Sequence, residues 1–309
     1  MPSSQSLLVS LALRALVKKN SQAEFDVARA RHWTDRLLSL PLPHLQVRFR
    51  PVHLPGVQGE WVDSGRPGPV LLYVHGGGYF FCSPRTHRPV TAFLTRALGG
   101  STLALKYRLA PEHPFPAALE DALAAYQSLL SSGYSQQQIV LAGDSAGGGL
   151  LLSTLVAIRQ KGLPMPVAAA CFSPWTDLAV TGPSLDRNDR NCAMFSAAGI
   201  RSARQLYLGQ ADPYDPRVSP LYADLRGLPP LLIHVSDNEV LLDDSLRLAE
   251  RAQAAGVQVS LQVWQNLPHV WQLFQRLVPE GRESLRQASQ FLSSHLVPDL
   301  LDELPFSLP

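Results

Sequence analysis

Five short, nearly continuous apolar runs constrain what this chain can fold into more than any other feature of its sequence. The runs cover residues 70–74, 102–105, 139–142, 167–172 and 231–235. Strands with both faces buried have this composition, because helices cover both sides of a parallel sheet. The runs therefore predict the central strands of such a sheet.

Segments with helical patterns separate these runs. Residues 116–130 begin with a proline that suits a first helical turn, residues 146–160 are rich in Leu and Ala, and residues 240–255 end at Gly256. A further strand is predicted at 259–264. Strands that alternate with helices indicate the α/β class, here a doubly wound, mostly parallel central sheet flanked by helices.

The 309 residues suffice for one large domain with a small elaboration. Residues 1–45 show helical patterns at 7–17 and 23–40, so we expect an N-terminal helical cap segment there. Residues 46–309 are predicted to form the catalytic α/β domain, opening with antiparallel edge strands at 45–49 and 57–62 that face solvent on one side. The polar, proline-rich stretch at about 183–220 predicts a cap insertion.

Charge and cysteine content exclude several classes of protein. The formal net charge is +2 and the basic residues are dispersed, so nucleic acid is not an expected partner. Cys82, Cys171 and Cys192 are odd in number and lack CxxC spacing. They predict free thiols in a reducing, cytoplasmic compartment and no metal site.

The apolar stretch at residues 7–17 is interrupted by Arg14 and is too short to cross a bilayer. We therefore expect neither an export signal nor integral membrane association. Its leucines at 7, 8, 11 and 16 suit one face of an amphipathic helix. Packing of that face on the protein itself is preferred over contact with lipid.

Ser145 lies at the centre of the pattern Gly-Asp-Ser-Ala-Gly at residues 143–147. A predicted strand precedes the pattern and a helical run follows it, which is the setting of a nucleophile elbow. A glycine-rich turn of this kind can also serve only close packing or phosphate binding. The serine at its tip has no packing role, so Ser145 is the candidate nucleophile.

A second glycine-rich motif, His75-Gly76-Gly77-Gly78, follows the predicted strand at 70–74. Glycines expose backbone N–H groups, and a tetrahedral oxyanion needs such donors. We expect the amides of Gly76 and Gly77, joined by that of Ala146, to form an oxyanion hole. His75 is expected to anchor this loop by hydrogen bonding.

A serine nucleophile needs a general base, and in this fold the histidine follows both the serine and the acid in the chain. Only His234, His269 and His295 follow Ser145. His234 falls within a predicted buried strand, and His295 belongs to a C-terminal helix. His269, in the loop after the strand at 259–264, is therefore the candidate base.

Three motifs together resemble the bacterial hormone-sensitive-lipase family of esterases in the α/β-hydrolase superfamily. They are HGGG at 75–78, YRLAPEHPFPAA at 107–118 and GDSAGG at 143–148, and they occur in the family's order. The resemblance covers roughly residues 45–297. It implies a carboxylesterase with a largely helical cap that hydrolyses short- to medium-chain esters without a cofactor.

The acid of the triad departs from the family's pattern. Where the family has Asp-Pro-Leu, this chain has the sequence DNEVLLDD at residues 237–244. Alignment of the helix end at 255–257 with the family's pattern puts Glu239, thirty positions before His269, at the place of the family's aspartate. Glu239 is therefore the preferred acid and Asp237 the alternative, whereas Asp243 and Asp244 lie too far into the following helix.

These features predict a serine carboxylesterase that works through an acyl-enzyme, with no cofactor and no metal. The alternatives are an amidase or lipase of the same fold, or a hydrolase-like protein that binds a small ligand at a disabled site. The expected partner is a small ester, and the oligomeric state is open between monomer and homodimer. Aromatic and apolar residues near the motifs are candidates for a substrate pocket: Tyr79, Phe80, Phe81, Met194, Phe195 and Trp271.

Overall fold

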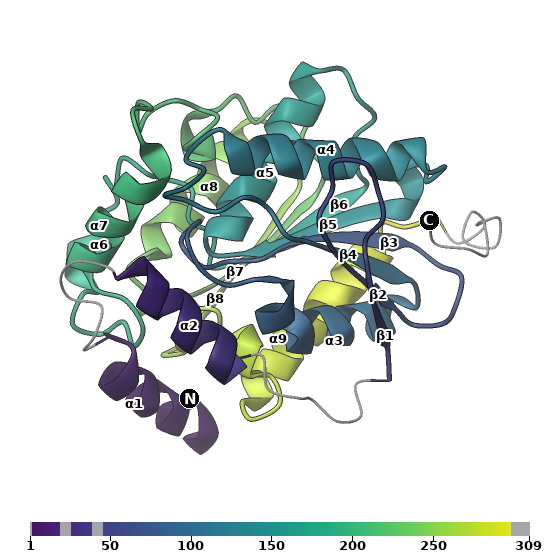
Figure 1. The fold of residues 1–309 in the computed structure, drawn as a ribbon. Helices are drawn as coiled ribbons and strands as arrows, with labels where there is room; N and C mark the ends of the chain where they lie inside the picture. The colour runs from purple at the N-terminus through teal and green to yellow at the C-terminus, as the bar shows by residue number, and fades with distance from the viewer. Residues whose placement is uncertain (1, 19–25, 39–45, 298–309) are drawn as a thin grey trace.

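The computed structural model describes residues 2–18, 26–38 and 46–297, and its centre is an eight-stranded sheet (Figure 1). The strand order is β1-β2-β4-β3-β5-β6-β7-β8. The strands from β4 to β8 are parallel, and β1 and β2 are antiparallel to their neighbours. Their bounds are β1 (Arg48–Pro51), β2 (Gly59–Asp63), β3 (Val70–Val74), β4 (Ser101–Leu105), β5 (Ile139–Asp144), β6 (Ala168–Phe172), β7 (Leu231–Ser236) and β8 (Val259–Trp264).

Helices cover both faces of this sheet (Figure 1). One face carries α4 (Ala117–Ser131), α5 (Ala146–Gln160) and α8 (Leu242–Ala254), and the other carries α3 (Arg88–Leu98) and α9 (Pro279–Ser293). Every residue of β3, β5, β6 and β7 is buried. The predicted parallel sheet between helical layers is confirmed.

The first two strands differ from the prediction of a solvent-facing edge pair. β1 is the edge strand and is largely exposed, but residues 60–62 of β2 are buried. β2 lies between β1 and β4, and α3 packs against it, where Arg88 forms an ion pair with Glu60 at 2.6 Å. Of these two strands, β1 is therefore the one at the edge of the sheet, and residue 45 of the predicted first strand lies outside the described residues.

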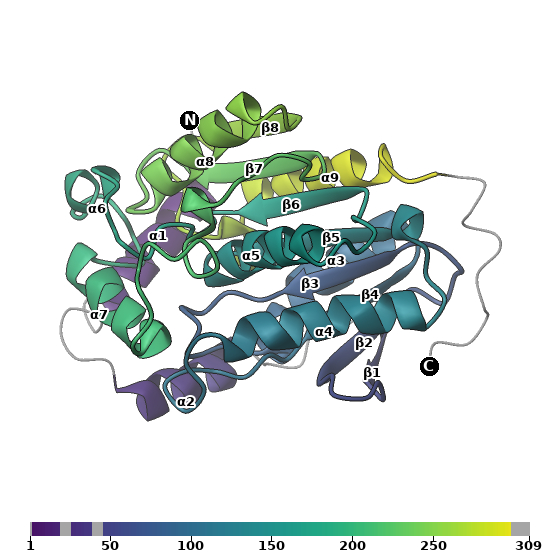
Figure 2. The same cartoon turned by 90° about the horizontal axis from the view of Figure 1, so that it is seen from above.

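Four helices gather at the end of the molecule where the parallel strands finish (Figure 2). They are α1 (Ser4–Leu16) and α2 (Val27–Leu38) from the N-terminal segment, and α6 (Ser184–Arg187) and α7 (Ala197–Leu208) from the stretch at 183–220. Ser3 donates from its backbone and its hydroxyl to Glu280 at the start of α9, and Lys18 donates to the carbonyls of Asp189 and Cys192. These contacts join the N-terminal segment to both α9 and the 183–220 stretch.

The orientation of α1 contradicts the expectation that its leucines pack on the protein. Leu8 is 66% exposed and Leu11 is 62% exposed, whereas Ser6 is fully buried. The Ser6 hydroxyl donates to the Ser3 carbonyl at 2.9 Å, so the buried side chain of α1 is a small polar group and not a leucine. None of the helices in the described part of the chain has the length and apolarity needed to span a bilayer.

A buried pair of carboxylates joins the loop after β6 to α8. Asp244 accepts the backbone N–H groups of Thr176 at 2.7 Å and Asp177 at 2.8 Å. Asp177 itself accepts from Arg247 at 2.9 Å and from Tyr222 at 3.0 Å. Burial, and then the negative charge of Asp177, raise the pKa of Asp244 to about 7. Below about pH 7, Asp177, whose pKa is lowered, therefore carries the charge of the pair and Asp244 holds the proton.

We predict that Asp244→Asn makes the stability of the protein less dependent on pH between about 4 and 7. An unfolded aspartate loses its proton near pH 4, so in this window the folded state binds more protons and its stability falls as the pH rises. The loss from Asp244 is at most about 1.4 kcal/mol per pH unit. Thermal unfolding followed at several pH values measures it, and an unchanged slope in the variant would contradict the prediction.

Candidate active site

Ser145 occupies the sharp turn between β5 and α5. Its φ of 51° and ψ of −125° are disfavoured for a residue with a side chain, a strain that is common at functional sites. A Cβ at Gly147 would overlap the carbonyl oxygens of Val74 and His75, so only glycine permits this approach of α5 to the end of β3. The predicted strand, turn and helix around Ser145 are present.

The loop after β3 runs directly beside this turn. A Cβ built on Gly76 would overlap the carboxylate of Asp144 and lie 3.1 Å from the Cβ of Ser145. Gly77 begins a tight turn, in which its carbonyl accepts the N–H groups of Phe80 and Phe81 at 3.0 Å. Ala146 is the first residue of α5 and is fully buried. Gly76 and Ala146, two of the residues expected to supply oxyanion donors, thus flank the serine, and Gly77 follows Gly76 in the same loop.

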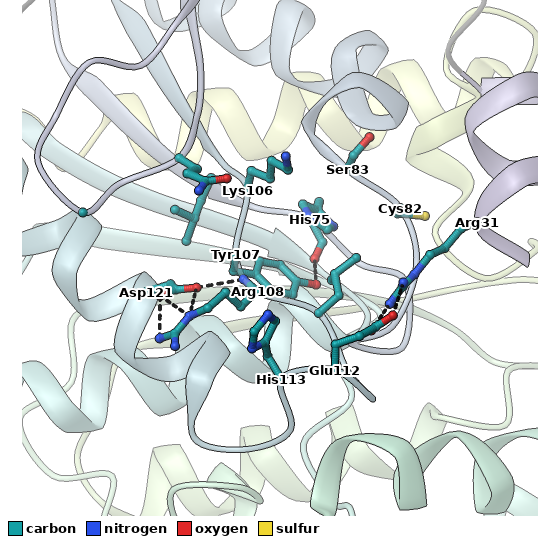
Figure 3. Close-up of a pocket in the computed structure, with 14 residues that line it drawn as sticks. Arg31, His75, Cys82, Ser83, Lys106, Tyr107, Arg108, Glu112, His113 and Asp121 are labelled. Atoms are coloured by element: carbon teal, nitrogen blue, oxygen red, sulfur yellow. Dashed lines mark hydrogen bonds and ion pairs between the residues drawn. The ribbon is translucent and has the colours of Figure 1, made fainter. Parts of the chain in front are cut away.

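His75 and Tyr107 make the contacts that anchor this loop. The Tyr107 hydroxyl donates to the His75 carbonyl at 2.9 Å, and the two rings stack at 4.4 Å (Figure 3). The His75 Nδ1 lies 2.7 Å from the carbonyl of Gly76. Burial lowers the pKa of His75 to about 3, so its ring is neutral at pH 7. These contacts agree with an anchoring role for His75.

A polar network that the sequence did not reveal lies under the elbow. The fully buried Asp144 carboxylate accepts from the Tyr73 hydroxyl at 2.7 Å and contacts His87 Nε2 at 3.2 Å. Burial opposes ionisation of Asp144, but the charge of His87 and the hydrogen bonds from His87 and Tyr73 outweigh it, so the pKa of Asp144 is lowered. The carboxylate beside the oxyanion loop is therefore ionised and held by two donors.

His269 lies in the loop after β8 and is only 2% exposed. Its Nδ1 is 2.5 Å from Oε2 of the fully buried Glu239. Its Nε2 is buried and has no hydrogen-bond partner among the described residues. With Nδ1 donating to the carboxylate, Nε2 carries the lone pair that a general base needs.

The other acids after β7 have different partners. Asp237 accepts the backbone N–H of Asn266 at 2.7 Å. Asp243 accepts from the backbone of Ser184 at 2.6 Å and from Arg187 at 3.2 Å. Glu239 is the carboxylate that the structure brings to His269, while Asp237 braces the start of the loop that carries the histidine.

The 183–220 stretch contributes an aromatic ring to the same place. Phe195 packs edge to face against His269, with ring centroids 5.2 Å apart. By contrast, His234 faces α9, where its Nδ1 is 2.7 Å from the Ser284 hydroxyl. Of the two histidines, only His269 therefore meets an acid and a residue of the covering segment.

A cavity of about 660 Å³ lies beside the oxyanion loop, lined by residues that include Arg31, His75, Cys82 and Tyr107 (Figure 3). Arg31 is paired with Glu112 at 2.7 Å across it. Neither Ser145 nor His269 lines this cavity, so a carbonyl bound there would not meet the serine. Within the described residues, no group of three His, Cys, Asp or Glu side chains could hold a metal ion.

The chain is similar to known hydrolases. Residues 71–273 match a family model described as the alpha/beta hydrolase fold. An acetyl-hydrolase of Streptomyces hygroscopicus is 45% identical over 234 residues, which are 75% of this chain and 78% of that protein. An esterase of Acinetobacter venetianus is 34% identical over 284 residues, or 91% and 94% of the two chains. A solved esterase from the bacterial hormone-sensitive lipase family has a TM-score of 0.89 at 42% identity, covering 96% of this chain and 100% of that chain.

Proposed function

Because the chain belongs to the α/β-hydrolase family and, within it, to the bacterial hormone-sensitive-lipase esterases, we propose that it is a serine carboxylesterase acting on short- to medium-chain esters. Ser145 is the nucleophile, His269 the general base and Glu239 the acid that orients it. The oxyanion donors are the backbone N–H groups of Gly76, Gly77 and Ala146. The observation that carries this proposal is His269, with Nδ1 on Glu239 and a buried, unpartnered Nε2.

The reaction proceeds in two acyl transfers. His269 Nε2 takes the proton of the Ser145 hydroxyl as its oxygen attacks the ester carbonyl, and the negative charge that develops on the carbonyl oxygen faces the backbone donors. The C–O bond to the alcohol then breaks, and His269 returns the proton to the leaving alkoxide. Water, deprotonated by His269, attacks the acyl-enzyme and releases the carboxylic acid with Ser145 restored.

Hydrogen bonds from backbone amides suit this chemistry because they do not have to reorient when charge develops. Each donor stabilises the transition state by roughly 3 kcal/mol in enzymes of this kind. The ionised Asp144 lies next to the same loop, where its charge opposes an oxyanion. The same carboxylate accepts from the Tyr73 hydroxyl and contacts His87 Nε2.

We predict that Ser145→Ala lowers the turnover of p-nitrophenyl esters by about 10⁴-fold or more, because the acyl-enzyme cannot form. The measurement is kcat and KM over a series of acyl lengths, with circular dichroism to verify folding. Anilide substrates and a triacylglycerol emulsion separate the alternative amidase and lipase functions. Ester turnover that persists in Ser145→Ala would contradict the assignment of Ser145 as the nucleophile. A wild-type protein that binds esters but does not hydrolyse them would favour the alternative of a ligand-binding protein.

The identity of the acid is tested by two separate variants. Glu239→Gln removes the charge that stabilises the imidazolium and is expected to lower kcat by about 10³- to 10⁴-fold. Asp237→Asn, in which the amide oxygen can still accept the N–H of Asn266, is expected to keep most of the activity. The opposite pattern would make Asp237 the acid.

We also propose that residues 1–45 and the insertion at about 183–220 form a cap on the catalytic domain of residues 46–309. Arg31 of α2 supports this division. Its Nε donates to the Phe80 carbonyl at 2.8 Å, and its terminal nitrogens reach the Ala110 carbonyl at 2.8 Å and Glu112 at 2.7 Å. Arg31 thereby attaches α2 to the turn that follows the glycines of the proposed oxyanion hole.

Arg31→Met, which removes these donors but keeps the apolar stem, is expected to alter the ratio of kcat/KM between butyrate and octanoate esters severalfold. The cause is a less firmly held α2 beside the oxyanion loop. Arg29→Met, at an exposed arginine of the same helix, serves as the matched control. Identical acyl-length profiles in both variants would argue against a substrate-shaping role for α2.

The site of action is proposed to be a reducing, cytoplasmic compartment, an assignment supported by the free thiols of Cys82, Cys171 and Cys192. Whether the protein forms a homodimer is tested by sedimentation velocity, which measures the mass of the species in solution. No step of the proposed reaction requires a second copy of the chain.

A further inference from the structure

We infer that Ser173 is a positioning residue of the triad: its hydroxyl fixes one oxygen of the Glu239 carboxylate so that the other oxygen faces His269. This inference rests on the proposed function, in which Glu239 is the acid. Its principal contact is with the acid, whose Oε1 accepts the Ser173 hydroxyl.

The fold brings Ser173 to this point from a neighbouring strand. Ser173 follows β6 directly and is fully buried. Its backbone N–H donates to the carbonyl of His234 on β7 at 2.7 Å, and the preceding Phe172 accepts the N–H of Ser145 at 2.8 Å. Ser173 is therefore fixed between the strand that leads to the nucleophile and the strand that leads to the acid.

The two oxygens of Glu239 have separate partners. Oε1 accepts the Ser173 hydroxyl at 2.7 Å and the backbone N–H of Ser236 at 2.8 Å. Oε2 faces His269 Nδ1 at 2.5 Å. The Ser173 oxygen also lies 3.5 Å from the backbone N–H of Val270, the residue after the histidine. One hydroxyl thus contacts the acid and borders the loop that carries the base.

A glutamate needs such anchoring more than an aspartate does. Its side chain has one more rotatable bond, so a carboxylate held at one oxygen only can rotate away from the imidazole. Two donors on Oε1 remove that freedom, because the plane of the carboxylate is then fixed. The backbone N–H of Ser236 supplies one of these donors, and the Ser173 hydroxyl supplies the other.

The backbone of Ser173 indicates that its hydroxyl, and not its shape, is the reason for a serine here. Its φ is +47°, in the left-handed region that glycine adopts without strain. A glycine would relieve the strain, yet it would leave Oε1 of the buried Glu239 with one donor fewer. Strain retained in a buried residue beside a catalytic group points to a functional role.

The test is a double-mutant cycle with Ser173→Gly, Glu239→Gln and the double variant, measured as kcat and KM on p-nitrophenyl butyrate together with the melting temperature. Ser173→Gly is expected to lower kcat by about 10- to 100-fold, the usual range for one hydrogen bond to a charged group. KM should change little, and the melting temperature should fall less than in a variant that keeps a Cβ at this positive φ, because glycine relieves the backbone strain. In the Glu239→Gln background, the same substitution should cause no further loss of kcat.

Ser173→Ala is the matched control, because it loses the same hydroxyl but keeps a Cβ at positive φ. It should match Ser173→Gly in kcat and melt at a lower temperature, and it serves in the cycle if the glycine variant does not fold. Near-normal kcat in either folded variant, or an equal loss with and without Glu239, would overturn the inference. The proposed function is judged separately, since Ser145→Ala abolishes turnover whether or not Ser173 matters.

Discussion

The turn at Ser145 is the constraint on which the rest of the site depends. It places a strained residue between β5 and α5, and the close approach of α5 to the end of β3 leaves no room for a side chain at Gly147. The same approach brings Gly76 against the elbow. The proposed nucleophile and the proposed oxyanion donors are therefore parts of one packing arrangement, and any change that moves β3 away from α5 separates them.

Two buried carboxylates of the site, Asp144 and Glu239, have different hydrogen-bond partners. Asp144 accepts from the Tyr73 hydroxyl and contacts His87. Glu239 has two donors on one oxygen and the imidazole of His269 on the other. A buried carboxylate without such partners would take up a proton. The partners hold Asp144 under the elbow and hold Glu239 where, in the proposed mechanism, it orients His269.

Local patterns in the sequence predicted the parallel sheet, the elbow at Ser145 and the loop at Gly76, because each is encoded by a few neighbouring residues. α3 was not predicted, because the β-branched Thr91 and Thr95 weaken the helical pattern of its segment. The proximity of Glu239 to His269 depends on how the loops after β7 and β8 pack together. The contact between Ser173 and Glu239 depends on the same packing. Such contacts are tertiary, so no local pattern shows them.

The ends of adjacent strands determine how these loops meet. β3, β5, β6, β7 and β8 are neighbours in the sheet, and at their carboxyl ends they carry, in that order, the oxyanion loop, Ser145, Ser173, Glu239 and His269. The pairing of Phe172 with His234 and of Ser236 with Trp264 sets how far each end extends. A slip of one residue moves a strand end by about 3.3 Å and reverses its faces, more than a hydrogen bond tolerates. The strands that specify this register therefore also specify the geometry of the proposed triad, although Ser145, Glu239 and His269 all lie beyond the strand ends.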